Sequence, residues 1–166
     1  MSAHKPLEGV KVVELASFVA APTAGRMMAE MGADVIRVES TAGDPWRFYG
    51  ANCGLPITDE ENPLFDIYNL GKKDIQLNTK TPEGKEILFH LLDEADVFIT
   101  NNRLKSLVRS GLDYESLKDR FPKLIYGLVT GYGQTGPDVD APGYDGVAFF
   151  SRSGMLADMA EPSGYP

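Results

Sequence analysis

Two strand-like segments separated by a helical segment constrain the fold of this chain more than any other feature. Residues 10–15 and 34–39 are short, largely apolar runs typical of buried strands. A helix is predicted from Pro22, which suits a first helical turn, to about Met31, with Gly32 as its stop. Its apolar positions are Ala24, Met27, Met28 and Met31. This order predicts a β-α-β unit with a right-handed crossover and parallel strands.

The same alternation continues along the chain. Strands are predicted at residues 74–78, 95–100 and 124–130, and helices at 104–110, 114–120 and 144–155. Another helix is predicted to begin at Pro82 with Thr81 as its N-cap. The residues expected to face inward from this helix and from the last one are Ile87, Leu88, Leu91, Leu92, Val147, Ala148, Phe150 and Met155. Residues 40–63 are polar and predict a long loop. The predicted fold class is α/β, a Rossmann-like, mostly parallel sheet with flanking helices.

Composition excludes several classes of protein. The 166 residues carry a net charge of −8, which argues against non-specific nucleic-acid binding. There is no run of 18 apolar residues and no secretory pattern at the N-terminus, so we expect a cytoplasmic protein without a membrane span. Cys53 is the single cysteine, which rules out an intrachain disulfide. Residues 160–166 read as a coil and not as a packed end, so the chain is expected to be incomplete.

Basic residues are concentrated in one part of this acidic chain. Seven of the 16 lie from Lys72 to Arg109, where there are only six acidic residues. A small polyanion could therefore bind there. For Lys85 the simpler interpretation, a solvated helix face, is preferred.

The sequence lacks the motifs of several common types of enzyme. The turn at residues 16–22 has no G-x-G-x-x-G pattern, which disfavours an NAD-dependent reductase, and no P-loop or G-x-S-x-G motif occurs. His4, His90 and Cys53 make no plausible zinc set, so no metal site is predicted. Cys53 also lacks a basic neighbour that would make it a nucleophile.

A glycine-rich loop follows the strand predicted at residues 124–130. Residues 131–137 contain three glycines and a proline, and residues 142–145 add Pro-Gly-Tyr-Asp. Ligands of open α/β sheets sit at the carboxyl ends of the strands, so this loop is a candidate binding element, although an ordinary surface loop fits the spacing as well. The polar residues expected at the same edge are Glu39, Asn101, Asn102 and Asp145. Asp145 could equally stabilise the N-terminus of the helix predicted after it.

Taken together, the motifs resemble one enzyme family. They are residues 7–15, residues 32–39 with Gly43 and Asp44, Lys72 and Lys73, residues 80–85, 95–96 and 111–114, and residues 131–137 with 143–145. In this order they resemble the N-terminal part of the family III coenzyme A transferases, which include the formyl-CoA:oxalate and carnitine CoA-transferases. Residues 100–109, with Asp44 and Pro45, resemble most the 2-hydroxyacyl-CoA transferases of amino-acid fermentation.

The resemblance implies a domain assignment and an activity. Residues 1–166 would be the N-terminal part of the Rossmann-like, CoA-binding large domain of a two-domain enzyme that forms an interlocked homodimer. In this family an aspartate attacks an acyl-CoA and passes through anhydride and aspartyl-CoA intermediates; that aspartate is expected beyond Pro166, so the 166-residue chain alone is predicted to be inactive. Acyl-CoA and carboxylic acids would be substrates, with no permanently bound cofactor. An α-methylacyl-CoA racemase of the same family and a non-catalytic nucleotide-binding α/β module are the alternatives.

The resemblance also implies site residues. Those near the adenosine end of CoA would be Ser40, Leu77, Thr79 and Lys80, and those near the pantetheine arm Asn101 and Asn102. Arg109 would bind phosphate. Phe18 and Val19 would face the thioester, and Asp145 would lie close to the catalytic carboxylate and tune its pKa. Two positions depart from some members of the family: Val19 replaces a glutamine and Ser40 an arginine.

Overall fold

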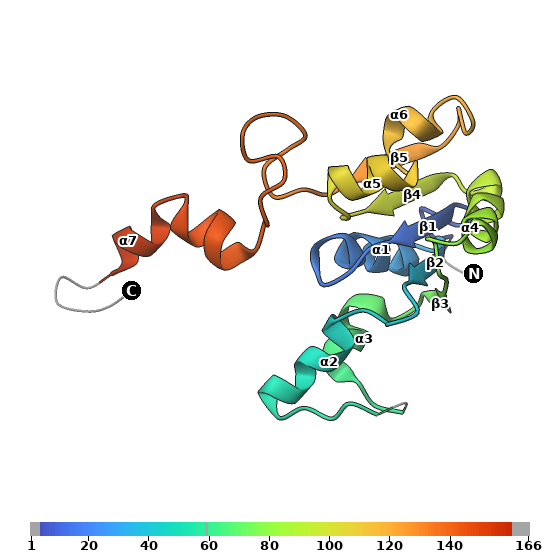
Figure 1. Ribbon diagram of the computed structural model, residues 1–166. Helices are drawn as coiled ribbons and strands as arrows, with labels where there is room; N and C mark the ends of the chain where they lie inside the picture. Colours follow the sequence, from blue (N-terminus) through green and yellow to red (C-terminus); the bar gives the residue numbers. More distant parts are fainter. Residues whose placement is uncertain (1–3, 59, 161–166) are drawn as a thin grey trace.

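The computed structural model describes residues 4–58 and 60–160, and a parallel five-stranded sheet forms its centre (Figure 1). The strands are β1 (Lys11–Leu15), β2 (Asp34–Glu39), β3 (Lys73–Gln76), β4 (Val97–Thr100) and β5 (Ile125–Leu128). They are ordered β3-β2-β1-β4-β5, and every neighbouring pair is parallel. The predicted α/β class and the parallel β-α-β unit are confirmed.

Helices cover both faces of this sheet (Figure 1). Helix α1 (Ala20–Glu30) lies on one face, and α4 (Pro82–Glu94), α5 (Leu104–Ser110) and α6 (Tyr114–Leu117) lie on the other. Between β2 and β3 the chain forms α2 (Trp46–Tyr49), the 3₁₀ turn η1 (Gly50–Cys53) and α3 (Pro63–Asn69), of which α3 packs against α1. Two more helical turns follow the glycine-rich loop, the π-helical η2 (Gly146–Ser151) and α7 (Met155–Met159).

Alternating residues of β1 divide the interior into two cores. Val13 and Leu15 join Phe98 and the buried leucines of α4, α5 and α6 on one face. Val12 joins Ala21 of α1 on the other. Burying one such side chain contributes about 1.5–3 kcal/mol, so the sheet is held firmly from both sides.

Helix α4 begins as predicted, but its inward face is narrower. Thr81 caps it, since its Oγ1 accepts a hydrogen bond from the Gly84 N–H at 3.2 Å. Leu88 and Leu92 are buried and Leu91 packs against their core. The prediction for Ile87 was wrong, because its side chain is 47% exposed. The buried stripe runs through positions four residues apart, and Ile87 lies beside it.

Helix α1 begins two residues before the predicted start. Pro22 is its third residue, where the missing N–H costs nothing because the first four N–H groups of a helix have no partner within it. Ala21, Pro22 and Gly25 form its buried side, whereas Met27 is 51% and Met31 43% exposed. The prediction was therefore wrong for Met27 and Met31, whereas Ala24 and Met28 do pack against the core on this face. Gly25 has no room for a side chain, because a Cβ there would lie 1.8 Å from Glu14 Oε2 of β1.

The long loop predicted at residues 40–63 contains α2 and η1 and ends at a helix that was not predicted. Asn62 caps that helix, α3, since its Oδ1 accepts from the Phe65 N–H at 3.3 Å, and Pro63 occupies the first position. An Asn-Pro pair is a recognised helix start, so the signal was present in the sequence.

The single helix predicted at residues 144–155 was wrong. Gly154 has φ +83° and separates η2 from α7, and the segment extends away from the sheet (Figure 1). Val147 and Met155 are exposed, and only Ala148 and Phe150 of the predicted inward set are half-buried. Most of the coil predicted at residues 160–166 lies outside the described residues. Among the described helices, none has the length and apolar character needed to cross a membrane.

Candidate functional site

The strand order creates a switch point between β1 and β4. Helix α1, which follows β1, packs on one face of the sheet, while α5, which follows β4, packs on the other. The segments that leave the two strands therefore diverge and open a crevice, where ligands of such sheets bind. Asn101 links them: its Nδ2 donates to the Ser17 carbonyl at 2.7 Å, and its Oδ1 accepts from the Ser17 N–H at 3.0 Å.

Phe18, next in this loop, has an uncommon backbone conformation. Its φ is +63°, and among the described residues no other non-glycine residue has a positive φ. This conformation costs roughly 1–2 kcal/mol for a residue with a Cβ. The Phe18 N–H donates to both carboxylate oxygens of Asp44 at 3.1 Å, which helps to offset that cost. The ring centroid lies 6.3 Å from that of Trp46 and 6.1 Å from that of Tyr144.

Beneath α1 lies a group of titratable side chains, here called the ion cluster: Glu14, Arg37, Glu39, Asp44, Arg47, Lys72 and Asp74. Arg37 is completely buried at its centre. Its Nη1 contacts Glu14 Oε1 at 2.7 Å, its Nε contacts Glu39 Oε1 at 3.0 Å, and its Nη2 donates to Asp44. Lys72 Nζ donates to Glu14 Oε2 at 2.8 Å. No buried side-chain N or O atom among the described residues lacks a hydrogen bond, so burial of these charges is compensated.

The ion cluster corrects two expectations. Lys72 is buried against Glu14, so it is not part of a surface for polyanions. Glu39 does not face the crevice as a free acid, because Arg37, Arg47 and the Asp44 N–H occupy its carboxylate. The sequence did carry a signal: Glu14 and Arg37 interrupt apolar strands at positions that face the same side as Val12 and Val35.

The ion cluster contains four carboxyl groups but only three cationic side chains. The pKa values of two neighbouring carboxyl groups, Glu39 and Asp74, are shifted in opposite directions. Burial alone would raise the pKa of Glu39, but hydrogen bonds from Arg47, Asp74 and Arg37 lower it to about 2. Burial and the adjacent Glu39 carboxylate raise the pKa of Asp74 to about 7, although Arg47 and Arg37 oppose this. Asp74 is therefore the carboxyl that holds a proton near neutral pH.

We expect this proton to make stability depend on pH. Folded Asp74 keeps its proton up to about pH 7, whereas its ordinary pKa is 3.8. The folded state then binds more protons between these values, so the free energy of unfolding should fall as pH rises from 5 to 8. Asp74→Asn should flatten this dependence in guanidinium unfolding series, and Asp34→Asn, at an exposed ion pair with Lys73, should not. An unchanged slope in Asp74→Asn would contradict the assignment.

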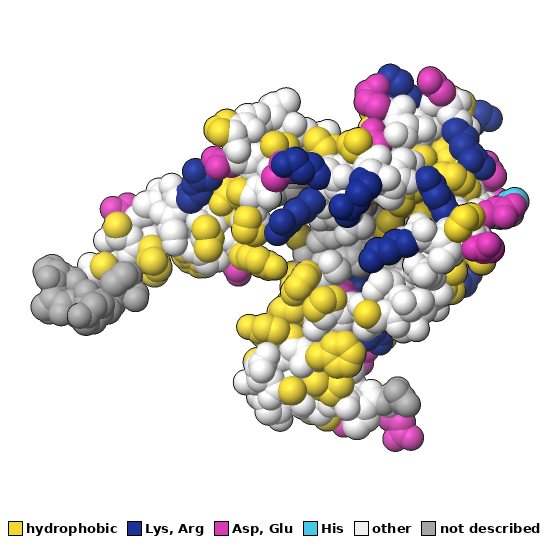
Figure 2. All heavy atoms as spheres, viewed as in Figure 1, with side chains coloured by type: hydrophobic (Ala, Val, Ile, Leu, Met, Phe, Trp, Pro, Cys, Tyr) yellow, Lys and Arg dark blue, Asp and Glu magenta, His cyan; other side chains and the backbone are white. Residues whose placement is uncertain are grey.

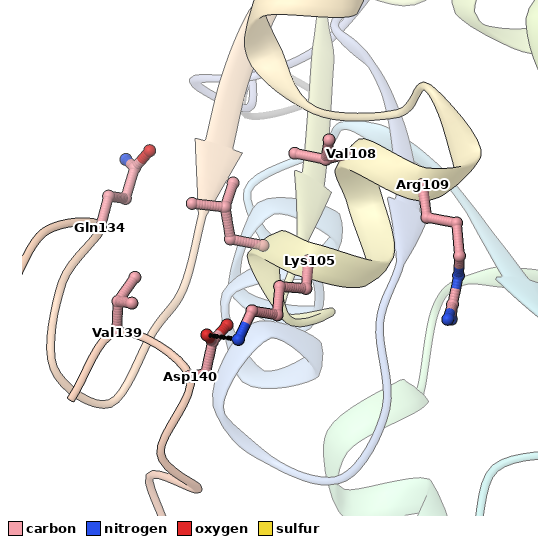
Figure 3. A pocket seen from close by; sticks show the side chains of 7 residues that line it. Lys105, Val108, Arg109, Gln134, Val139 and Asp140 are labelled. Atoms are coloured by element: carbon pink, nitrogen blue, oxygen red, sulfur yellow. Dashed lines mark ion pairs between the residues drawn. The ribbon is translucent and has the colours of Figure 1, made fainter. Parts of the chain in front are cut away.

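A cavity of about 390 Å³ lies between α5 and the glycine-rich loop (Figure 3). Its lining residues are Leu104, Lys105, Val108, Arg109, Gln134, Val139 and Asp140. An ion pair between Lys105 and Asp140 joins its two sides, and Arg109 remains exposed beside it. Lys and Arg side chains also gather on the surface over α5 and toward α4 (Figure 2). The cavity thus combines an apolar lining with cationic groups.

Two glycines close the base of the glycine-rich loop. A Cβ on Gly131 would lie 2.4 Å from the Cα of Gly143, and a Cβ on Gly143 would lie 2.4 Å from the Cα of Gly131. The two backbones approach so closely that neither position accepts a side chain. This contact brings Tyr144 back toward the Phe18 loop, so the glycine-rich loop and the loop after β1 border the same region.

The sequence model of CoA-transferase family III matches residues 7–166 of this chain. The chain belongs to this family. It is 51% identical to cinnamoyl-CoA:phenyllactate CoA-transferase of Clostridium sporogenes and 45% identical to (R)-2-hydroxy-4-methylpentanoate CoA-transferase of Clostridioides difficile, over 95% and 96% of the chain. A CAIB/BAIF family protein from Brucella suis superimposes with a TM-score of 0.88 at 41% identity, covering 98% of this chain and 43% of that protein. The chain spans 38% and 40% of the two curated relatives. The predicted resemblance is confirmed.

The family III chain places its predicted CoA residues at adjoining strand ends. Ser40 follows β2 and Leu77 follows β3, and the Leu77 N–H donates to the carbonyl of Glu39 at 2.9 Å. Thr79 and Lys80 continue from there, with Lys80 exposed. Asn101 and Asn102 follow β4, and the Asn102 N–H donates to Thr100 Oγ1 at 3.2 Å. Their roles stay predictions; Asn101, in addition, has a structural partner in Ser17.

The structure also describes the residues that were predicted to lie near the reacting carbonyl. Val19 is the N-cap of α1 and offers no side-chain cap. Asp145 is exposed, and its Oδ1 accepts from the Gly146 N–H at 3.0 Å, so it does cap η2. This fits the second of its two predicted roles and leaves the first open. Among the described residues no three His, Cys, Asp or Glu side chains are grouped to hold a metal ion.

Proposed function

We propose that this chain is the N-terminal, CoA-binding part of an acyl-CoA:carboxylate CoA-transferase whose acceptor is a 2-hydroxy acid. The observation that carries the proposal is a cationic cavity beside the switch-point crevice in a chain of CoA-transferase family III. The two relatives compared above are named for phenyllactate and 2-hydroxy-4-methylpentanoate, both of them 2-hydroxy acids. Residues 1–166 form the first part of the large domain in this proposal, and the complete protein is an interlocked cytoplasmic homodimer.

The proposed reaction conserves the thioester energy. An aspartate from the remainder of the protein attacks the acyl carbonyl, expels CoA thiolate and forms a mixed anhydride. The thiolate then attacks the aspartyl carbonyl, which releases the first carboxylate and forms an aspartyl-CoA thioester. The acceptor acid reverses both steps. Covalent catalysis thereby divides one difficult exchange into easier ones, without ATP or a permanently bound cofactor.

Residues of this chain bind CoA and adjust the nucleophile in this scheme. Arg109 offers a forked guanidinium for a phosphate group at the cavity of α5. Ser40, Leu77, Thr79 and Lys80 line the adenosine end, and Asn101 and Asn102 the pantetheine arm. Phe18 and Val19 face the thioester. Asp145 lies near the nucleophilic carboxylate and raises its pKa through like charge.

The complete protein is expected to convert cinnamoyl-CoA and phenyllactate into phenyllactyl-CoA and cinnamate, detected by liquid chromatography. Loss of a hydrogen bond to a charged group costs about 1.5–3 kcal/mol, so Arg109→Ala should weaken CoA binding roughly tenfold to a hundredfold in calorimetry. Lys73→Ala serves as the control, because Lys73 lies on the edge strand β3 and is exposed, paired with Asp34 of β2.

Three results would count against the proposal. Exchange of the α-proton of an acyl-CoA without CoA transfer would indicate a racemase, and CoA binding without either reaction would indicate a non-catalytic module. Transferase activity of the 166-residue chain alone would refute the expected location of the nucleophile.

A further inference from the structure

Asp44 joins two segments that are far apart in the sequence. It is only 2% exposed and lies between the loop after β1 and the start of α2. Its Oδ1 accepts from the Trp46 N–H at 2.9 Å, and both of its oxygens accept from the Phe18 N–H at 3.1 Å. A single carboxylate thus sets the positions of Phe18 and Trp46 relative to each other.

The surroundings of Asp44 require a carboxylate. Arg37 donates to Oδ2, so both oxygens face donors only: two backbone N–H groups and a guanidinium. An asparagine would turn its own N–H₂ toward one of these donors and lose that acceptor. Glu39 in turn accepts from the Asp44 N–H at 3.0 Å, which ties the Asp44 backbone to the ion cluster.

We propose that Asp44 is a positioning residue for the transfer reaction. It holds Phe18 in the left-handed conformation and so fixes the loop at residues 17–19, with the Phe18 ring beside Trp46 and Tyr144. This inference rests on the proposed function, in which that loop faces the thioester. The positions proposed to bind CoA lie on α5 and after β2, β3 and β4. The side chain of Asp44 accepts hydrogen bonds from Phe18, Arg37 and Trp46, and none of these three is among those positions. Asp44 should therefore affect kcat more than the KM for acyl-CoA.

The test compares two isosteric substitutions within the ion cluster of the complete protein. Displacing a reacting group by about 1 Å can cost 10²-fold in rate, so Asp44→Asn should lower kcat about 10²-fold and change KM less than about threefold. Asp74→Asn changes a carboxyl group of the same cluster that has no contact with the loop, so the kcat of this variant should stay within about threefold of wild type. Amide exchange measured by mass spectrometry should accelerate at least about tenfold in peptides covering residues 16–20 in Asp44→Asn and not in Asp74→Asn.

Each outcome decides the inference. A wild-type kcat in Asp44→Asn, or a lowered kcat with unchanged exchange at residues 16–20, overturns it while the proposed function stands. An inactive wild-type protein removes the proposed function and this inference with it. If Asp44→Asn does not fold, Asp44→Glu keeps the negative charge beside Arg37 but displaces the carboxylate, and the same loss of kcat is expected; wild-type activity in that variant overturns the inference.

Discussion

Replacing Arg37 with methionine should abolish cooperative folding of the chain. Methionine occupies similar space but leaves Glu14, Glu39 and Asp44 buried without the guanidinium that each of them contacts. Breaking a buried ion pair by removing one partner costs about 3–5 kcal/mol, and here one arginine serves three carboxylates. Because the total stability of a domain is only about 5–15 kcal/mol, most of it should be lost.

Guanidinium unfolding followed by circular dichroism measures this effect. The matched control is Lys73→Met, the same kind of substitution on a neighbouring strand, where Lys73 is exposed and pairs with Asp34 at 2.7 Å. Exposed pairs contribute about 0–1 kcal/mol, so this variant should unfold near the wild-type midpoint. Equal midpoints for Arg37→Met and wild type would show that the ion cluster does not support the fold.

Much of the fold could be predicted because it depends on local patterns. The strand at residues 34–39 and the helix at 104–110 have the predicted bounds. The signals for both are short-range ones: a run of apolar residues marks the strand, and the glycine at position 111 marks the end of the helix. Family membership could also be predicted, because several short motifs occurred in the right order.

The remaining features depend on contacts between distant segments. The ion cluster combines residues from β1, β2 and β3 with Asp44, Arg47 and Lys72, and no local pattern pairs them. The exposure of Met27 and Met31 has the same reason. Their helical spacing could not indicate that Gly25 of the same helix packs against Glu14 of β1. The positive φ of Phe18 likewise follows from Asp44, 26 residues away in the sequence.

Gly25→Ala should destabilise the chain by at least about 3 kcal/mol, even though alanine is the better helix former by about 1 kcal/mol. A Cβ at this position of α1 would lie 1.8 Å from Glu14 Oε2 and 3.2 Å from the Cε of Lys72. Both groups are buried, and burial already raises the pKa of Glu14 and lowers the pKa of Lys72. Displacing Glu14 would leave Lys72 without its carboxylate, which has the cost of a broken buried pair.

Gly146→Ala is the matched control for this substitution, because it adds the same methyl group to a helical turn where nothing lies within 4 Å. Its effect on the free energy of unfolding should stay within about 1 kcal/mol and could be favourable, since alanine loses less backbone freedom on folding. A wild-type midpoint for Gly25→Ala would mean that α1 can move away from β1 without loss. The close approach of that helix to Glu14 would then not be what keeps Arg37 and Lys72 in place.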